Sequence, residues 1–295
     1  MASFGKSSSA EQVTAGIDLR GKLALVTGVN SGIGFETMRV LALRGARVIG
    51  TARTLAKAEA ACRQVTGALI PLACELESQA SIRACAKDIA KLERPLDLLI
   101  ANAGIMALPK LEQVGGIEKQ FATNHLGHFL LVNLLRPQLD AAEAARVVVV
   151  SSAAHLQAPP GGIEFDNLSG ERGYGAWRAY GQSKLANVLF ANALARRLGP
   201  KRAASSLHPG LIGTNLGRSM SPLLSGAMSL FMRPFSKTIP QGAATSCYVA
   251  TRPELQGLSG TYFSDCAAAK ASRHAADEAL AERLWEVSEQ LTGLR

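Results

Sequence analysis

The chain has 295 residues, of which 47% are hydrophobic and 19% charged, and this composition excludes a long disordered chain. Its 32 lysines and arginines outnumber its 23 acidic residues, and the formal net charge of +9 suits an anionic ligand, a membrane surface or nucleic acid. The charges are dispersed, however, and basic residues do not interleave with aromatic ones, so we expect no nucleic-acid partner.

Short apolar runs alternate along the chain with longer stretches in which apolar residues recur at helical spacing. The short runs predict strands over residues 23–27, 47–50, 68–72, 96–101, 147–150, 203–207 and 260–263. The longer stretches predict helices over residues 33–44, 54–66, 78–92, 117–136, 176–198, 240–251 and 280–291. Pro137 is expected to stop the helix over residues 117–136, because proline lacks the N–H that a helix interior requires.

This alternation is typical of an α/β fold with a doubly wound parallel sheet and helices on both faces. The four consecutive valines at 147–150 fit a central strand of such a sheet, since both of its faces are covered. No repeat and no linker occurs after residue 20. We therefore predict a mobile N-terminal tail over residues 1–17 and a single domain over residues 18–295.

A glycine-rich turn joins the first predicted strand to the first predicted helix. Glycines let a backbone turn tightly and approach a pyrophosphate, whose charge is stabilised at a helix N-terminus. Such a turn can also be purely structural, but here it has the strand–turn–helix context of a dinucleotide site. The predicted cofactor-binding residues of the turn are Gly28, Asn30, Ser31, Gly32, Ile33 and Gly34.

The second predicted strand ends without a carboxylate. In sites that bind NAD, an acidic side chain about 20 residues after the turn holds the ribose 2′-hydroxyl. Here Ala52 and Arg53 occupy that region, and a guanidinium suits a 2′-phosphate; Lys57 could assist. We therefore predict that NADP(H) is preferred and that NAD(H) is possible; a solvated surface charge is the alternative reading of Arg53.

Tyr180 and Lys184 are four residues apart and share one face of a predicted helix. A tyrosine hydroxyl becomes an effective acid or base near neutral pH only when a nearby cation favours the phenolate, and Lys184 can supply that cation. Polar residues accompany the pair at the ends of predicted strands and in a predicted helix. They are Ser151 and Ser152, Asn102 with Ala103 and Gly104, and Asn124.

Together these strings resemble the short-chain dehydrogenase/reductase family over about residues 18–265. Within it the chain looks most like the branch of retinol-dehydrogenase-like and WW-domain-oxidoreductase-like proteins. The strings that carry this closer resemblance lie at residues 18–22, 183–190, 207–210, 241–246 and 259–263. The resemblance implies a single-domain Rossmann fold and hydride transfer between a nicotinamide and the carbonyl or alcohol carbon of an apolar small molecule.

The resemblance also implies roles for individual residues. Tyr180 would act as the general acid or base and would also contact the cofactor. Ser152, with Ser151 as a less suitable stand-in, would hold the substrate oxygen. Lys184 would lower the pKa of Tyr180 and hold the nicotinamide ribose, and Asn124 would support a water-linked proton relay. The remaining implied cofactor contacts are Asn102, Ala103 and Gly104, then Glu75 and Leu76 near the adenine, and Pro209, Gly210 and Thr214 near the nicotinamide.

Two segments near the predicted site in the sequence are expected to contact the substrate or its surroundings, and one of them has several possible roles. Residues 155–177 form an insertion that is expected to shape the substrate pocket. Residues 211–240 are expected to form a substrate loop; within it the apolar and basic stretch 215–239 could be a mobile lid, a packed helix or a peripheral membrane contact. The resemblance implies a homodimer or homotetramer, paired through the helices that carry Asn124 and Tyr180.

The cysteines and histidines predict neither disulfides nor a metal site. Five cysteines is an odd number, no Cys-x-x-Cys occurs, and no secretory signal is evident, so we expect reduced thiols and a cytoplasmic protein. No run of 18 apolar residues predicts a membrane span. His125 and His128 are three residues apart, but no carboxylate or thiol partner is evident, and packed or surface histidines are expected.

A non-catalytic protein that senses a cofactor or binds a partner on the same fold is the alternative to an enzyme.

Overall fold

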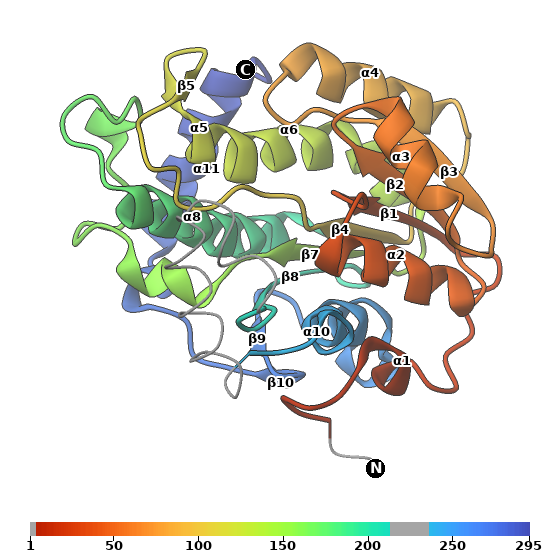
Figure 1. Cartoon of the computed structure of the whole chain (residues 1–295). Coiled ribbons are helices and arrows are strands. Elements are labelled where there is room, and N and C mark those ends of the chain that lie inside the picture. Colours follow the sequence, from red (N-terminus) through yellow and green to blue (C-terminus); the bar gives the residue numbers. More distant parts are fainter. Residues whose placement is uncertain (1–3, 213–235) are drawn as a thin grey trace, which may run out of the picture.

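A twisted sheet of eight strands organises residues 4–212 and 236–295, which are the residues that the computed structural model describes (Figure 1). The strand order is β10-β9-β8-β7-β4-β1-β2-β3, and all neighbours are parallel except β9 and β10. The strands are β1 (Leu23–Thr27), β2 (Arg47–Ala52), β3 (Leu69–Ala73), β4 (Leu98–Ala101), β7 (Arg146–Val150), β8 (Ala203–His208), β9 (Tyr262–Ser264) and β10 (Ala267–Ala268).

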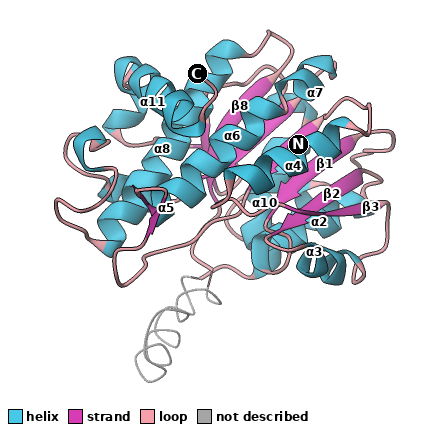
Figure 2. Ribbon diagram, turned by 90° about the horizontal axis from the view of Figure 1, so that it is seen from above, coloured by secondary structure: helices cyan, strands magenta, loops and turns pink. Residues whose placement is uncertain are grey.

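Helices cover both faces of this sheet, which confirms the predicted doubly wound Rossmann fold in one domain (Figures 1 and 2). One layer contains α4 (Gln79–Ala90), α5 (Lys119–Phe121), α6 (Gly127–Leu134), α8 (Ala176–Arg197) and α11 (Glu278–Thr292). The other contains α1 (Ala10–Val13), α2 (Gly32–Leu43), α3 (Leu55–Cys62) and α10 (Ile239–Thr251). Shorter elements are the hairpin of β5 (Gln113–Val114) and β6 (Ile117–Glu118), the helix α7 (Arg136–Ala141), the π-helical turn η1 (Ala122–Leu126), and the 3₁₀ turns η2 (Ala153–Gln157), η3 (Phe165–Asn167), η5 (Pro253–Leu255) and η6 (Arg273–Ala276).

The uninterrupted apolar strands follow from this double covering. In β1 the side chains of Leu23 and Leu25 join the core beneath α4, α6 and α8, whereas those of Ala24 and Val26 join the core beneath α2, α3 and α10. Successive side chains of a strand point to opposite faces, so a strand buried on both faces must be apolar at every position.

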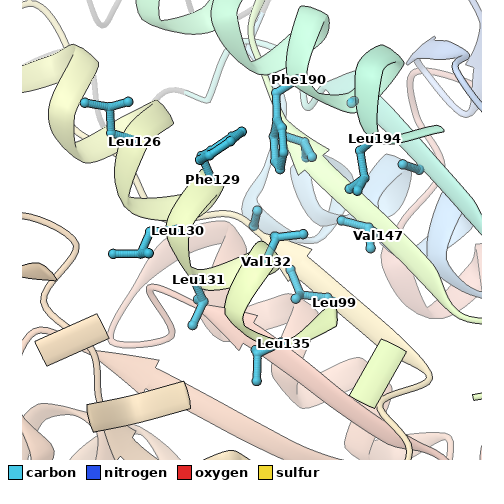
Figure 3. Close-up of a cluster of buried hydrophobic side chains, with 14 of the residues drawn as sticks. Leu99, Leu126, Phe129, Leu130, Leu131, Val132, Leu135, Val147, Phe190 and Leu194 are labelled. Carbon is cyan, nitrogen blue, oxygen red and sulfur yellow. The ribbon is translucent and has the colours of Figure 1, made fainter. Parts of the chain in front are cut away.

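Aromatic side chains fix α6, α8 and α11 relative to one another. The rings of Phe129 and Phe190 lie 5.4 Å apart between centroids, and Trp285 lies 4.9 Å from Phe129 and 5.8 Å from Phe190. Figure 3 shows Phe129 on α6 pointing toward Phe190 on α8, above Val147 of the sheet. This packing sets the spacing of the two helical segments that carry Asn124 and Tyr180.

The prediction of one helix over residues 117–136 is wrong in detail. Gly115 and Gly116 both have positive φ angles, 58° and 79°, and make the two-residue turn that pairs Val114 with Ile117 in a hairpin. The helical path then passes through α5, η1 and α6 and ends at Leu134. Pro137 lies in the first turn of α7, where a missing N–H costs nothing, so it begins a helix as well as following one.

The N-terminal segment is the second difference from expectation. Residues 4–17, which we expected within a mobile tail, pack against α2 and α10, because α1 is amphipathic: Ala10 and Val13 are fully buried, and Glu11 pairs with Arg39 of α2. Ser9 caps α1 through a capping box. The Phe4 ring meets the Tyr248 ring edge to face, and the guanidinium of Arg252 lies over the Phe4 ring. The segment therefore belongs to the folded unit.

Within the described ranges no helix has the length and apolar character needed to cross a membrane. The predicted lid, residues 215–239, lies outside the described residues except for its last four positions.

Candidate active site

The predicted site residues converge at the carboxyl ends of β1, β4, β7 and β8, which are neighbours in the sheet. Gly28 follows β1, Asn102 follows β4, Ser152 follows β7 and Pro209 follows β8. Strand order reverses between β1 and β4, and open α/β sheets bind ligands at such a point.

The glycine turn is packed so tightly against itself and the segment after β4 that side chains at Gly28 and Gly34 would clash. At Gly34 an added Cβ would lie 2.4 Å from both Asn102 Nδ2 and the Gly28 carbonyl oxygen; at Gly28, where φ is 74°, it would lie 2.9 Å from Ala103 Cβ. Gly32 also has a positive φ, 63°. Asn30 and Ser31 are exposed, and Ile33 is half-buried. Ser31 precedes α2, but its side chain makes no capping hydrogen bond, so it does not occupy the first N–H groups of α2, which are groups that suit a phosphate. The turn fits a dinucleotide.

Gly34→Ala is expected to destabilise the fold by about 1–3 kcal/mol, since the new methyl overlaps backbone that cannot move freely. It should also weaken dinucleotide binding about tenfold, equivalent to about 1.4 kcal/mol, by pushing the turn out of register with Asn102. Thermal unfolding and NADPH titration followed by fluorescence measure the two effects. Gly161→Ala is the control, since a Cβ there meets nothing within 4 Å; equal behaviour of the two variants would contradict the argument.

The residues predicted to hold the adenosine end lie at the ends of β2 and β3. Arg53 is exposed, and over the described ranges Arg53 forms no ion pair. It directly precedes Thr54, whose side chain caps α3. Lys57 is exposed in the first turn of α3. Glu75 is half-buried, whereas Leu76 is buried in the core. Leu76 packs closely on α6, since a Cβ added to Gly127 would lie only 2.8 Å from the Cβ of Leu76.

Thr27, at the last position of β1, organises the segment after β4. Its Oγ1 accepts hydrogen bonds from the N–H groups of Asn102 (2.9 Å) and Ala103 (3.0 Å), and its carbonyl accepts one from Asn102 Nδ2 (2.9 Å). Gly104, which follows Ala103, is exposed and lies close to the predicted catalytic groups. A Cβ at Gly104 would be 2.9 Å from Asn124 Oδ1 and 3.5 Å from Lys184 Nζ. We did not single out Thr27 from the sequence, although a hydroxyl closing an apolar strand is a usable signal.

Asn124 lies in the π-helical turn η1 and is fully buried. Its Oδ1 accepts from the N–H of Ile105 at 2.8 Å, and its Nδ2 donates to the Ile105 carbonyl and to Ser183 Oγ, both at 2.9 Å. The side chain therefore ties the loop after β4 to α8. Single π turns occur frequently at functional sites.

Tyr180 and Lys184 lie in α8 beside the end of β7. The Lys184 ammonium lies 5.7 Å from the centroid of the Tyr180 ring and donates to the Val150 carbonyl at 3.0 Å. Burial lowers the pKa of Lys184 to about 8. Burial raises the pKa of Tyr180, and a hydrogen bond with the Ser152 side chain opposes that rise. Ser151 is buried and donates to the Lys184 carbonyl at 2.7 Å, so Ser152 is the serine that reaches Tyr180.

The turn after β8 forms the far side of the site. Pro209 is buried, and Gly210 has a φ of 100°; a Cβ there would lie 2.5 Å from Lys237 Cδ. Lys237 is itself buried and pairs with Asp265 at 2.6 Å. Nothing in the sequence marks Lys237 as a neighbour of this turn. Thr214, predicted to contact the nicotinamide, lies outside the described residues.

The comparisons with known proteins agree with this arrangement. The family model described as short chain dehydrogenase matches residues 22–223. The chain belongs to the short-chain dehydrogenase family. It is therefore an oxidoreductase of a family that uses nicotinamide dinucleotides and acts on small molecules, and the resemblance to the retinol-dehydrogenase-like branch is confirmed.

Individual relatives cover nearly the whole chain. It is 43% identical to the chloroplastic short-chain dehydrogenase TIC 32 B of Brassica napus, over 98% of this chain and 94% of the relative. It is 42% identical to retinol dehydrogenase 14 of Homo sapiens, over 94% of this chain and 88% of the relative. A crystal structure of an uncharacterized protein from Mycobacterium paratuberculosis superimposes with a TM-score of 0.78 at 35% identity, covering 97% of this chain and 98% of that one.

The insertion over residues 155–177 lies beside Tyr180. Trp177 is 50% exposed, and its ring meets that of Tyr180 edge to face at 6.1 Å. Two further exposed apolar side chains, Leu156 and Leu211, lie on the segments that follow β7 and β8. His155 Nδ1 contacts the Ser152 carbonyl at 2.7 Å, which anchors η2 to the serine. The segments around the site thus expose apolar side chains.

The two histidines of the predicted helix are packed, as expected. His125 and His128 are both fully buried; His125 contacts Ser288 of α11, and His128 contacts Thr27. Among the described residues, no three His, Cys, Asp or Glu side chains gather as metal ligands.

Proposed function

We propose that the protein is an NADP(H)-dependent oxidoreductase that acts on the carbonyl or alcohol carbon of an apolar small molecule, with Tyr180 as general acid and base. The observation that carries the proposal is the convergence of Tyr180, Ser152, Lys184 and Asn124 beside a glycine turn that has no space for side chains.

The nicotinamide, when bound, supplies or accepts the hydride. Ser152 binds the substrate oxygen, and Tyr180, which the serine already contacts, gives that oxygen a proton in reduction or removes one in oxidation. Lys184 places a positive charge near the phenolic ring and lowers the pKa of Tyr180 once the site is loaded. Asn124 holds the loop after β4 in place and supports proton exchange near Lys184.

Arg53 is exposed and has no ion pair with any residue that the structure describes, which supports NADP(H) over NAD(H). Arg53→Ala is expected to raise the KM for NADPH about tenfold or more, because a charge-assisted hydrogen bond is worth about 1.5–3 kcal/mol, and to leave the KM for NADH unchanged. Initial rates with both cofactors measure this. Arg63→Ala, at the far end of α3, is the matched control; an equal change for both cofactors would contradict the assignment.

The exposed apolar residues Trp177, Leu156 and Leu211 support an apolar substrate. The direct experiment follows oxidation of NADPH, with NADH in parallel, against a panel of apolar aldehydes and ketones that includes retinal, since retinol is in the name of several relatives. Turnover supports the proposal. A protein that binds the cofactor tightly and turns over no carbonyl would favour the alternative, a cofactor-sensing protein without catalysis.

We also propose a reducing compartment, which the cytoplasm provides, because Cys62, Cys74, Cys85, Cys247 and Cys266 are all buried free thiols.

For the oligomeric state, we still expect a homodimer or homotetramer. Since α11 packs on α8 and places Trp285 against Phe129 and Phe190, pairing of subunits on that side would involve α11 as well.

A further inference from the structure

His128 joins two parts of the site that are far apart in the sequence. It lies on α6, one helical turn after Asn124, and is fully buried. Its Nε2 is 2.9 Å from Thr27 Oγ1, and its Nδ1 is 3.0 Å from the backbone carbonyl oxygen of Asn124. The imidazole thus spans the end of β1 and the π turn η1.

The partners of the ring allow only one arrangement of protons. The Asn124 carbonyl can only accept, so Nδ1 must carry the hydrogen. Burial lowers the pKa of His128 to about 4, so the ring is neutral and Nε2 is an acceptor. The Thr27 hydroxyl therefore donates to Nε2.

This assignment leaves both lone pairs of Thr27 Oγ1 for the N–H groups of Asn102 and Ala103, which lie 2.9 and 3.0 Å away. The Thr27 hydroxyl, both nitrogens of His128 and the backbone groups of Asn102, Ala103 and Asn124 that they contact then all have partners. Buried networks of this kind hold their members rigidly, because each alternative arrangement leaves a polar group without a partner.

We propose that His128 is a positioning residue: through Thr27 it fixes the backbone of Asn102 and Ala103 at the dinucleotide site, and through the Asn124 carbonyl it couples that backbone to the π turn of the proton-transfer site. The inference rests on the proposed function for its effect on turnover. Its effects on proton placement and dinucleotide binding do not depend on catalysis.

The same helix supplies a matched control. His125 is equally buried, packs among Phe121, Phe129 and Phe190, and contacts Ser288 of α11. Among the described residues it has no hydrogen bond to Thr27 or to the Asn124 carbonyl. A loss of packing or of one buried hydrogen bond affects both histidines, whereas a positioning role belongs to His128 alone.

The first test is nitrogen NMR of the unliganded wild-type protein labelled at histidine. We expect His128 to be neutral with its proton on Nδ1 from pH 5.5 to 8. A proton on Nε2, or a charged ring in that range, would overturn the inference, and this result does not depend on any variant folding.

The second test compares NADPH affinity in His128→Phe and His125→Phe, by fluorescence titration. His128→Phe should raise Kd about tenfold, equivalent to about 1.4 kcal/mol, and His125→Phe should change it less than about twofold, because only His128 bonds to Thr27 at the dinucleotide site. Thr27→Val combined with His128→Phe should weaken binding less than the two separate effects multiplied, because both changes break one network. Equal Kd values for the two phenylalanine variants would refute the proposal. An inactive wild type with the predicted Kd changes would refute only the proposed function.

Discussion

Tyr180→Phe is expected to lower kcat for carbonyl reduction about a thousandfold, within the range of about 10²–10⁴ that a positioned general acid contributes. Phenylalanine preserves the ring that packs edge to face on Trp177 but removes the hydroxyl that contacts Ser152. The substrate oxygen would then have no proton donor, while the glycine turn and Asn102 would be untouched. Stopped-flow or steady-state oxidation of NADPH gives kcat, and a fluorescence titration should show an unchanged Kd for NADPH.

Tyr248→Phe is the matched control for this change. Tyr248 lies on α10, and its ring contacts Phe4 instead of the site. It should retain wild-type kcat. If Tyr180→Phe also kept normal turnover, the assignment of Tyr180 as the acid would be wrong.

Lys184→Met is expected to have two opposite effects, a loss of turnover of about a hundredfold or more and a gain in stability of the unliganded protein. The catalytic loss follows because the cation beside the phenolic ring disappears. The stability gain follows because burial disfavours the charged amine. The difference between a pKa of about 8 in the folded protein and the ordinary value of 10.5 corresponds to about 3 kcal/mol of free energy of unfolding. Such trade-offs between stability and activity are common at functional sites.

The pH dependence distinguishes this cause from a general packing effect. Below pH 8 the lysine is charged in both the folded and the unfolded chain, so the full destabilisation is present. Between pH 8 and 10.5 the unfolded chain binds more protons than the folded one, so the stability of the wild type rises with pH. The advantage of Lys184→Met should therefore shrink above pH 8, as urea unfolding at several pH values would show.

Loss of the Lys184 hydrogen bond does not leave the Val150 carbonyl without a donor, so the stability change reports mainly on the buried charge. The Val150 carbonyl also accepts from Asn187 Nδ2, at 3.2 Å, so it keeps a partner in the methionine variant. Lys91→Met, which removes an exposed ion pair with Asp88, should change stability little at any pH. A Lys184→Met protein less stable than the wild type at pH 7 would contradict the argument.

The sheet and most helices could be predicted because the pattern that specifies them is local. The valines of β7 and the residues of β1 are apolar at every position, and the resulting strands match the expected ranges closely, as do α8 and α10. The glycine turn could also be recognised, because its glycines lie between a predicted strand and a predicted helix, which is the context of a dinucleotide site. The prediction of the family depended on several such strings occurring in one order.

The remaining features depend on contacts between distant segments. The two glycines at 115 and 116 break the predicted helix only because Val114 and Ile117 can pair. The π turn at Asn124 is one extra residue in a helix, which no periodicity over five residues reveals. The contact between Thr27 and His128 spans 101 positions, so neither residue alone indicates the network that joins them.

The docked N-terminal segment has a practical consequence for handling the protein. The family match begins at residue 22, and a chain trimmed to that point would lose Ala10 and Val13. The apolar surface of α10 around Ala243 and Cys247, which these residues now cover, would face water and favour aggregation. A purification tag is better attached after Arg295, where the last helix has already ended, than in exchange for the first residues.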